Sequence, residues 1–254
     1  MHCMKDWFSW NGERCTEYGV YVREQPAIIR PSERVSTVTV PGRSGALTLP
    51  EGEDVYDDIV LACDCVMRDP LTPLRGSIES RIAQFNGWLR GSGRVSFACR
   101  PNGWYEGRVS NQISFEKILR GNPHVSFSVQ FRCAPCFYLY DGLNRCVMTG
   151  SEMTLRNRGN TAANPLITVT GAGSGSISVV GRNVQTLYLN DLAAGESIVL
   201  DCDARVAYVQ GEGGIELSGA QLSGDWLTFP TGQFSVLTEG DITGVAITPR
   251  WRCI

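Results

Sequence analysis

Apolar and polar residues alternate along much of the chain, which is the pattern of β-strands with one buried and one exposed face. The clearest runs are Val55–Met67, where Ile59, Leu61, Cys63, Cys65 and Met67 recur at every second position, and Val125–Cys133, where every second residue is apolar. Val95, Phe97 and Cys99 repeat the pattern between these two runs, and we expect all three side chains in a core. The first part of the chain is therefore predicted to be built mainly of antiparallel strands.

One segment breaks the alternation and has a helical period instead. Its apolar residues follow one another at spacings of four, four, three and four, and they are Leu74, Ile78, Ile82, Phe85 and Leu89. Thr72 can cap such a helix with Pro73 at the first position, and Gly91 suits the position after its end. This pattern predicts one amphipathic helix that covers one face of a sheet.

From about residue 140 onward the helical period is absent, and short apolar runs recur between turn signals at the spacing of β-sandwiches. Glycine-rich Gly171–Ser176 is expected to be a plain turn between two strands, because a phosphate-binding loop would need a following helix. The strands expected here are Leu166–Thr170, Ser176–Val180, Val184–Leu189, Ser197–Asp201, Arg205–Gln210, Trp226–Phe229 and Gly244–Trp251. We predict a mainly β protein: a sandwich-like α+β domain at 1–140 with one helix and a protruding hairpin, and an all-β sandwich domain at 141–254.

Composition narrows the function classes. The chain has 254 residues, a net charge of -3 and no cluster of basic residues, so nucleic-acid sequence recognition is not expected. No apolar run reaches the ~18 residues of a membrane span, and the N-terminus lacks the apolar core of a signal peptide. We therefore expect synthesis and retention in a cytoplasm, with most of the ten cysteines unpaired and buried.

Candidate chemistry is sparse. Cys133 and Cys136 form a CxxC, but a redox motif of this kind needs its first thiol at a helix N-terminus, and here the motif ends a strand. Zinc is the other option, with Cys63 and Cys65 as further ligands, although no second CxxC supports it. The two histidines, His2 and His124, lie at a terminus and in a turn. We predict no enzyme activity, no cofactor and no metal.

The stretch VTVPGRSGALTL, Val38 to Leu49, has strand-like alternation on both sides of the connector Pro41–Gly45. Proline cannot donate to a strand ladder and glycine adopts positive φ, so the connector is predicted to be a hairpin loop with Arg43 at its tip. An acidic loop, Glu51–Asp58, follows.

The opening FSWNGERCTEYGVYV (Phe8 to Val22), the PGRSG hairpin and the acidic loop resemble, in this order, the N-terminal region of the distal tail (Dit) proteins of long-tailed bacteriophages and prophages. LRNRGNTAANPLITVTGAGSG, FPTGQF and the terminal ITPRWRCI extend the resemblance over nearly the whole chain. The resemblance implies an N-terminal ring-forming domain and a C-terminal galectin-like β-sandwich.

The resemblance implies that the protein has a structural role in the virion and is not an enzyme. Copies of the protein would close into a homohexameric ring at the distal end of the tail tube. The other partners implied are the tail tube protein and the tail-associated hub protein, with the tape-measure and receptor-binding proteins as further candidates. The place of action would be the virion tail tip, after assembly in the host cytoplasm.

Ring closure needs two different complementary patches on each copy. The hairpin and the acidic loop carry opposite charges, which makes them candidates for the two sides of one interface. The expected interface residues are Pro41, Gly42, Arg43, Ser44, Gly45, Glu51 and Asp54. The alternative function is a carbohydrate-binding sandwich acting in host-surface adhesion, with Trp226, Phe229 and Trp251 as stacking aromatics.

Overall fold

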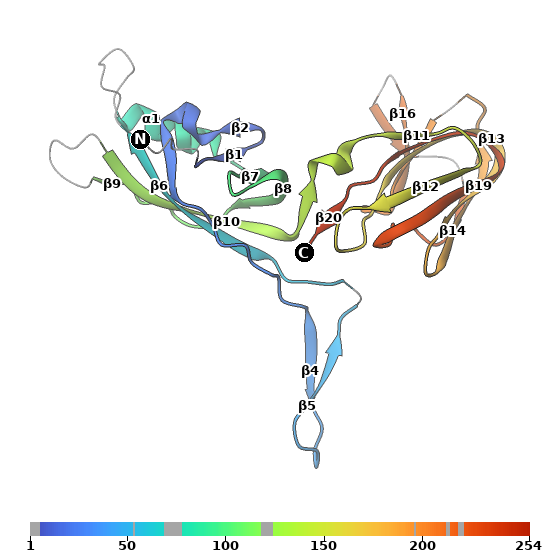
Figure 1. Ribbon diagram of the computed structural model, residues 1–254, viewed down its shortest axis with the longest axis horizontal. Helices are drawn as coiled ribbons and strands as arrows, with labels where there is room; N and C mark the ends of the chain where they lie inside the picture. Colours follow the sequence, from blue (N-terminus) through green and yellow to red (C-terminus); the bar gives the residue numbers. More distant parts are fainter. Residues whose placement is uncertain are drawn as a thin grey trace. The chain divides into compact units, whose positions relative to one another are not determined.

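The computed structural model describes residues 6–52, 54–68, 78–117, 124–195, 197–211, 214–217 and 221–254. The chain divides into two compact units: the first runs up to Phe137 and includes Ile254, and the second is Tyr138–Cys253. Both are built mainly of antiparallel strands, which confirms the mainly β fold class (Figure 1). No helix in the described part of the chain is both long and apolar enough to cross a bilayer.

The first unit contains one large curled sheet, with strand order β2-β1-β7-β8-β10-β6-β3 and with β9 paired to β10. Its elements are β1 (Phe8–Trp10), β2 (Glu13–Arg14), the 3-10 turn η1 (Cys15–Tyr18), β3 (Val20–Glu24), β6 (Ile59–Arg68), α1 (Ile78–Trp88), β7 (Ser92–Phe97), β8 (Arg100–Val109), β9 (Glu116–Lys117) and β10 (His124–Leu139). The two long alternating runs found in the sequence are β6 and β10, and they pair from His124↔Arg68 to Cys133↔Ile59.

Helix α1 covers the apolar face of this sheet, as its period predicts. Phe85 is fully buried, and its ring lies 6.4 Å from Phe8 of β1 and 5.3 Å from Phe127 of β10. Ile78 and Leu89 are buried on the same stripe, whereas Leu74 and the expected cap at Thr72 and Pro73 lie outside the described residues. The core of this unit is therefore an aromatic layer between α1 and the sheet.

The cysteines follow the strand pattern with one correction. Cys63 and Cys65 of β6 are buried, as their alternation predicts. Cys99 is exposed, because β7 ends at Phe97 and the chain turns into β8 at Arg100, so the expected core position of Cys99 is wrong. The nine described cysteines are all free thiols; Cys3 lies outside the described residues.

In the described residues the second unit is one nine-stranded sheet that folds into a sandwich. Its two long strands, β13 and β19, run through both layers, which we call the two sheets of the sandwich. The first half of β13 pairs with β15 and its second half pairs with β14, while β19 runs alongside β13 and also pairs with β11 and β12. The elements are η3 (Tyr140–Leu143), β11 (Cys146–Met148), β12 (Glu152–Asn157), β13 (Leu166–Val180), β14 (Val184–Leu192), β15 (Ser197–Asp201), β16 (Val206–Gly211), β17 (Gly214–Leu217), β18 (Gln221–Gly224), β19 (Gly232–Thr248) and β20 (Arg252–Cys253).

The glycine-rich segment Gly171–Ser176 is not a turn between two strands, as the sequence suggested. It lies within β13, at the register shifts where this strand passes from one sheet to the other. A Cβ atom at Gly171 would lie 2.6 Å from the backbone oxygen of Asp241, and one at Gly175 would lie 2.8 Å from that of Glu239. Glycine is therefore needed here because two strand backbones approach closely at the corner.

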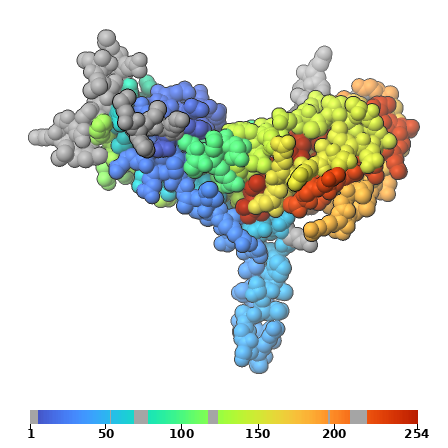
Figure 2. All heavy atoms as spheres, viewed as in Figure 1, coloured from blue at the N-terminus to red at the C-terminus, as the bar shows by residue number. Residues whose placement is uncertain are grey.

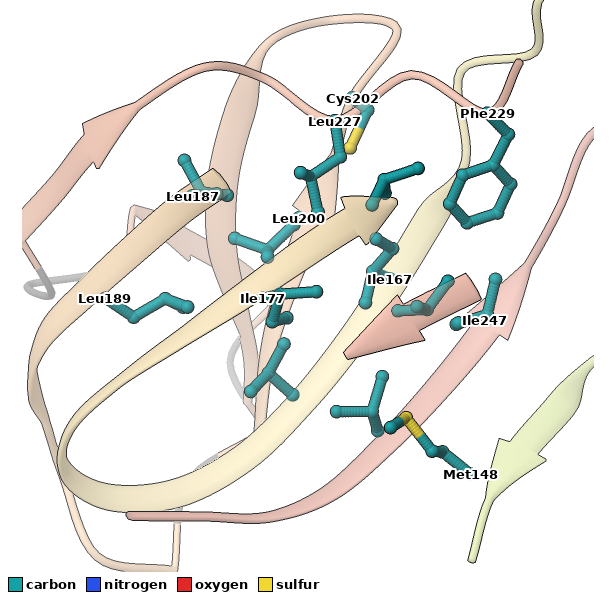
Figure 3. Close-up of a cluster of buried hydrophobic side chains, with 14 of the residues drawn as sticks. Met148, Ile167, Ile177, Leu187, Leu189, Leu200, Cys202, Leu227, Phe229 and Ile247 are labelled. Atoms are coloured by element: carbon teal, nitrogen blue, oxygen red, sulfur yellow. The ribbon is translucent and has the colours of Figure 1, made fainter. Parts of the chain in front are cut away.

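The core of the second unit lies between its two sheets. Figure 3 shows Ile177 and Leu189 on strands that frame the same apolar cluster as Ile167 and Ile247, and these residues are fully buried. Phe229 and Trp251 belong to this cluster, with exposed fractions of 0% and 5%, and Trp226 packs against it. The segment Trp226–Phe229 is not the expected strand; Phe229 alone forms a bridge, to Ala163. Phe229 and Trp251 therefore fill the core and offer no surface platform for a sugar, whereas Trp226 is partly exposed.

Candidate assembly interface

The hairpin predicted at Val38–Leu49 is present as a separate two-stranded sheet formed by β4 (Val35–Thr39) and β5 (Ala46–Pro50) (Figure 1). Its loop begins with a turn in which the Arg43 N–H donates to the Val40 carbonyl at 3.2 Å. Pro41 occupies the second position of this turn, and Gly42 has a φ of 81° at the third. Proline and glycine at these two positions are the residues that a type II turn requires, so the local sequence fixes the loop.

The two faces of the hairpin differ in polarity. Val38 lies directly opposite Leu47, and Leu49 lies opposite Ser36 on the same face. The other face carries Thr37 opposite Thr48, flanked by Val35 opposite Pro50 and by Thr39 opposite Ala46. Strand alternation thus places three large aliphatic side chains together on one face, and we call this set, Val38, Leu47 and Leu49, the hairpin stripe.

The hairpin stripe is uncovered. Figure 2 shows the hairpin with its surface open, and every residue from Ser32 to Gly52 is exposed. The exposed fractions of Val38, Leu47 and Leu49 are 46%, 36% and 46%. A lone two-stranded hairpin is only marginally stable in water, and clustered aliphatic side chains on a surface mark a contact site. The hairpin stripe is therefore a candidate contact site.

Charge is separated along the hairpin. Arg43 is exposed at the tip and makes no ion pair within the described part of the chain. Glu51 is held at the base, where its Oε1 accepts a hydrogen bond from the Ser36 hydroxyl at 3.0 Å. Asp54, also at the base, has a φ of 57°. Because about five residue pairs separate tip from base, Arg43 lies roughly 17 Å from these carboxylates along the strand direction.

Two other acids of the predicted acidic loop are used within the chain. Asp57 accepts a hydrogen bond from Arg34 Nε at 3.0 Å, and Asp58 lies 3.3 Å from Arg132 Nε. All four side chains are about half exposed, so each pair contributes about 0–1 kcal/mol. The first pair joins the two ends of the hairpin at its base, and the second joins this base to β10. Of the acids of this loop that the structure describes, Glu51 and Asp54 make no such ion pair.

The CxxC lacks the geometry of a redox or metal centre. Cys133 and Cys136 are three positions apart on β10, so strand alternation points them to opposite faces. Burial raises the pKa of the Cys133 thiol to about 12, whereas a reactive thiol needs a lowered pKa. Within the described residues no group of three or more His, Cys, Asp or Glu side chains is arranged to hold a metal ion.

Sequence reasoning identified the turn and Arg43 but missed the hairpin stripe. The signal was available, because Val38, Leu47 and Leu49 alternate with polar residues just as core strands do. Alternation alone does not say whether the apolar face is covered by the same chain or by another.

No protein-family model and no curated protein sequence matches the chain. Solved structures do match. The chain superimposes on the Dit (gp 19.1) protein of phage SPP1, described as a paradigm of the hub adsorption apparatus in phages infecting Gram-positive hosts, with a TM-score of 0.71 and 17% identity over 95% of this chain and 97% of that one. A chain of the phage p2 baseplate in its activated conformation matches with a TM-score of 0.55 and 6% identity, covering 95% of this chain and 96% of that one. Both units thus share the fold of the SPP1 Dit protein over almost their full length.

Proposed function

We propose that the protein is a structural component of a phage tail tip and that copies of it close into a hexameric ring at the distal end of the tail tube. The observation that carries this proposal is the fold match to the SPP1 Dit protein, which covers both units and leaves little of either chain unmatched. A structural role agrees with a chain whose thiols are largely buried and whose CxxC lacks catalytic geometry.

The first unit supplies the ring contacts in this proposal. A closed ring uses heterologous interfaces, in which one patch of each copy meets a different patch of the next. The hairpin stripe is one such patch, because its three aliphatic side chains remain 36% to 46% exposed in their own chain. Burying each of them between two copies would contribute about 1 kcal/mol, since each is already partly covered by its hairpin neighbours.

Arg43 gives the same contact its specificity. Its guanidinium is free at the hairpin tip, and the base of the hairpin carries Glu51 and Asp54, which are too far away to pair with it in one chain. In a ring, the tip of one hairpin can meet the carboxylates of the next copy. Arginine pairs with a carboxylate through two parallel hydrogen bonds, which fixes direction as well as distance.

The ring would join the tail tube protein on one side to the tail-associated hub protein on the other. The tape-measure and receptor-binding proteins are further partners, the latter through the second unit. The protein would act at the virion tail tip after assembly in the host cytoplasm.

Light scattering of the purified protein, alone and mixed with the tail tube protein, tests the proposal. The expected mass of the ring itself is six times the chain mass of 27.8 kDa, and any bound tube protein adds to it. A defined ring of another order would contradict the proposal, as would a protein that stays monomeric when the tube protein is present.

A further inference from the structure

A cavity of about 550 Å³ lies at the base of the hairpin. Its wall is formed by Glu33 and Arg34 before β4, by Pro50 at the end of β5, and by Gly52 and Asp54–Tyr56 after it. None of these residues is fully buried, so the cavity is open to solvent. The whole wall belongs to the first unit, like the hairpin itself, and we call this cavity the base socket.

Backbone hydrogen bonds hold the wall of the base socket in place. Glu33 forms a bridge with Tyr56, and the Arg34 N–H donates to the Val55 carbonyl at 2.9 Å. Asp54, in the turn that these contacts close, has a φ of 57°, a left-handed conformation that aspartate tolerates better than most residues. The base socket is therefore already formed in a single chain.

Three charged side chains lie in the described wall of the base socket, and two of them are already paired. Glu33 Oε1 lies 3.5 Å from Arg30 Nη2, and Arg34 Nε lies 3.0 Å from Asp57 Oδ1. Asp54 is exposed and makes no ion pair within the described residues. Its carboxylate is therefore the charged group of this wall that remains available to a partner.

The electrostatic potential in the base socket is negative. Partial burial raises the pKa of the Tyr56 hydroxyl, and the charges of Asp54 and Glu33 raise it further. The opposing effect of Arg30 is smaller. A negative potential favours a cation, and Val55 adds apolar surface to the same wall. The base socket thus suits a cationic side chain that comes with apolar neighbours, and it repels anions.

The tip of the hairpin has the matching properties. Residues 35–50 contain a single charged side chain, that of Arg43, and it is exposed. Val40, beside the turn, is exposed as well, at 38%. Five residue pairs separate the tip from the base of the hairpin (Figure 1), so Arg43 cannot enter the base socket of its own chain. The cation and the Asp54 carboxylate can therefore meet only between two molecules.

We propose that the base socket binds the hairpin tip of a second copy of the chain, with the Arg43 guanidinium on the Asp54 carboxylate. This inference rests on the proposed ring and adds the site that receives the tip. A second copy satisfies both groups at once, whereas a basic partner would leave Arg43 unpaired and an acidic partner would be repelled by the socket. Arginine binds a carboxylate through two parallel hydrogen bonds, which makes the contact directional.

The contact is heterologous, since each copy donates one tip and offers one base socket. A chain with a reversed tip charge and a chain with a reversed socket charge should therefore each fail alone and complement each other when mixed. In a mixed ring of six the two chains alternate. Each reversed tip then meets a reversed socket, and each unmodified tip meets an unmodified socket.

The test compares ring formation by the full chain and its variants in the presence of the tail tube protein, with native mass spectrometry to count the copies of each variant. Arg43→Glu and Asp54→Lys should each lower the ring yield about tenfold or more, because like charges then meet at every contact. Asp54→Asn removes the charge but keeps a residue that tolerates the left-handed backbone, and it should lower the yield severalfold. An equal mixture of Arg43→Glu and Asp54→Lys should restore rings that contain three copies of each.

Glu24→Lys is the matched control, because Glu24 is an exposed acid of the same unit outside the base socket. It should form rings like the unmodified chain and should not restore Arg43→Glu, and every variant should keep the melting temperature. If the unmodified chain forms rings, an undiminished yield from Arg43→Glu or Asp54→Lys, or a mixture that restores nothing, would overturn the base-socket contact alone. Absence of rings from the unmodified chain would overturn the proposed function and this inference together.

Discussion

The guanidinium of Arg250 meets the carboxylate of Asp201 at two points, with Nη1 2.8 Å from Oδ1 and Nη2 3.1 Å from Oδ2. Both side chains are mostly buried, at 28% and 18% exposed. Asp201 Oδ1 also accepts the backbone N–H groups of Asp203 and Ala204. One ion pair therefore fastens the C-terminal segment of the second unit to the turn that follows β15.

This pair predicts a pH-dependent stability. Burial acts to raise the pKa of Asp201, but the hydrogen bonds from Arg250 and from the turn outweigh it, so the pKa lies below its usual value. A lowered acid pKa stabilises the fold above the unfolded-state pKa, near 3.9, and that stability is lost as the pH falls through the folded-state pKa. Arg250→Ala should cost the second unit about 1–2 kcal/mol at pH 7, with the gap to the unmodified protein narrowing below about pH 4.

Hydrogen exchange of the β13 and β15 amides measures the stability difference between Arg250→Ala and the unmodified protein within the second unit alone. Arg145→Ala, an exposed arginine of the same unit, controls for the loss of charge. A gap between Arg250→Ala and the unmodified protein that is equally large at pH 7 and at pH 3 would contradict the ion-pair explanation.

The hairpin stripe predicts an assembly defect without a folding defect. Val38→Asp with Leu47→Asp should abolish ring formation, because two adjacent carboxylates would then face an apolar contact. Thr37→Asp with Thr48→Asp places the same charges opposite each other on the other face of the hairpin and should assemble far better. Both variants should keep the melting temperature of the first unit, since every residue from Ser32 to Gly52 is exposed. Equal loss of rings in the two variants would mean that the hairpin stripe is not the contact face.

Removing the Arg43 side chain should also weaken ring assembly, by less than the two aspartates on the hairpin stripe do. Arg43→Ala should reduce ring yield, by a few kcal/mol of assembly free energy if its ion pair is desolvated in the ring and by about 0–1 kcal/mol if it is exposed. Arg30→Ala serves as the control, because its side chain is 79% exposed and pairs locally with Glu33. A lower melting temperature with normal ring yield would make Arg43 an anchor within its own chain instead.

The thiols should differ sharply in reactivity. Burial raises the pKa of Cys15, Cys133 and Cys202 to about 12, so at pH 8 these thiols are protonated as well as inaccessible. Partial burial raises the pKa of Cys99 as well, but this residue is exposed in the turn between β7 and β8, so a maleimide should label it well before the three buried thiols. Mass spectrometry of labelled peptides locates the reaction. Labelling of Cys133 at the rate of Cys99 in the folded protein would show that the CxxC is open to solvent.

Local patterns predicted the elements that a single segment can specify. Strands β6 and β10, helix α1 and the hairpin turn follow from alternation, a helical period and the Pro41–Gly42 pair. The likeness to the distal tail proteins, first seen in short motifs, is confirmed at the level of the fold.

Long-range geometry could not be predicted in the same way. The Gly171–Ser176 segment looked like a turn because glycine is common in turns, but the glycines serve a backbone-to-backbone contact with Asp241, which is distant in sequence. Cys99 was assigned to a core because alternation does not reveal where a strand ends. The interface residues Pro41–Gly45, Glu51 and Asp54 remain a prediction, because their partner belongs to another molecule.

The most direct measurement of the central claim is the rotational symmetry of this protein within assembled tail tips. Electron cryo-microscopy of tails that contain it, reconstructed without imposed symmetry, should show a ring of six copies at the end of the tube, with each hairpin stripe seated against the neighbouring copy. A ring of another order, or six copies whose hairpins contact no neighbour, would contradict the account.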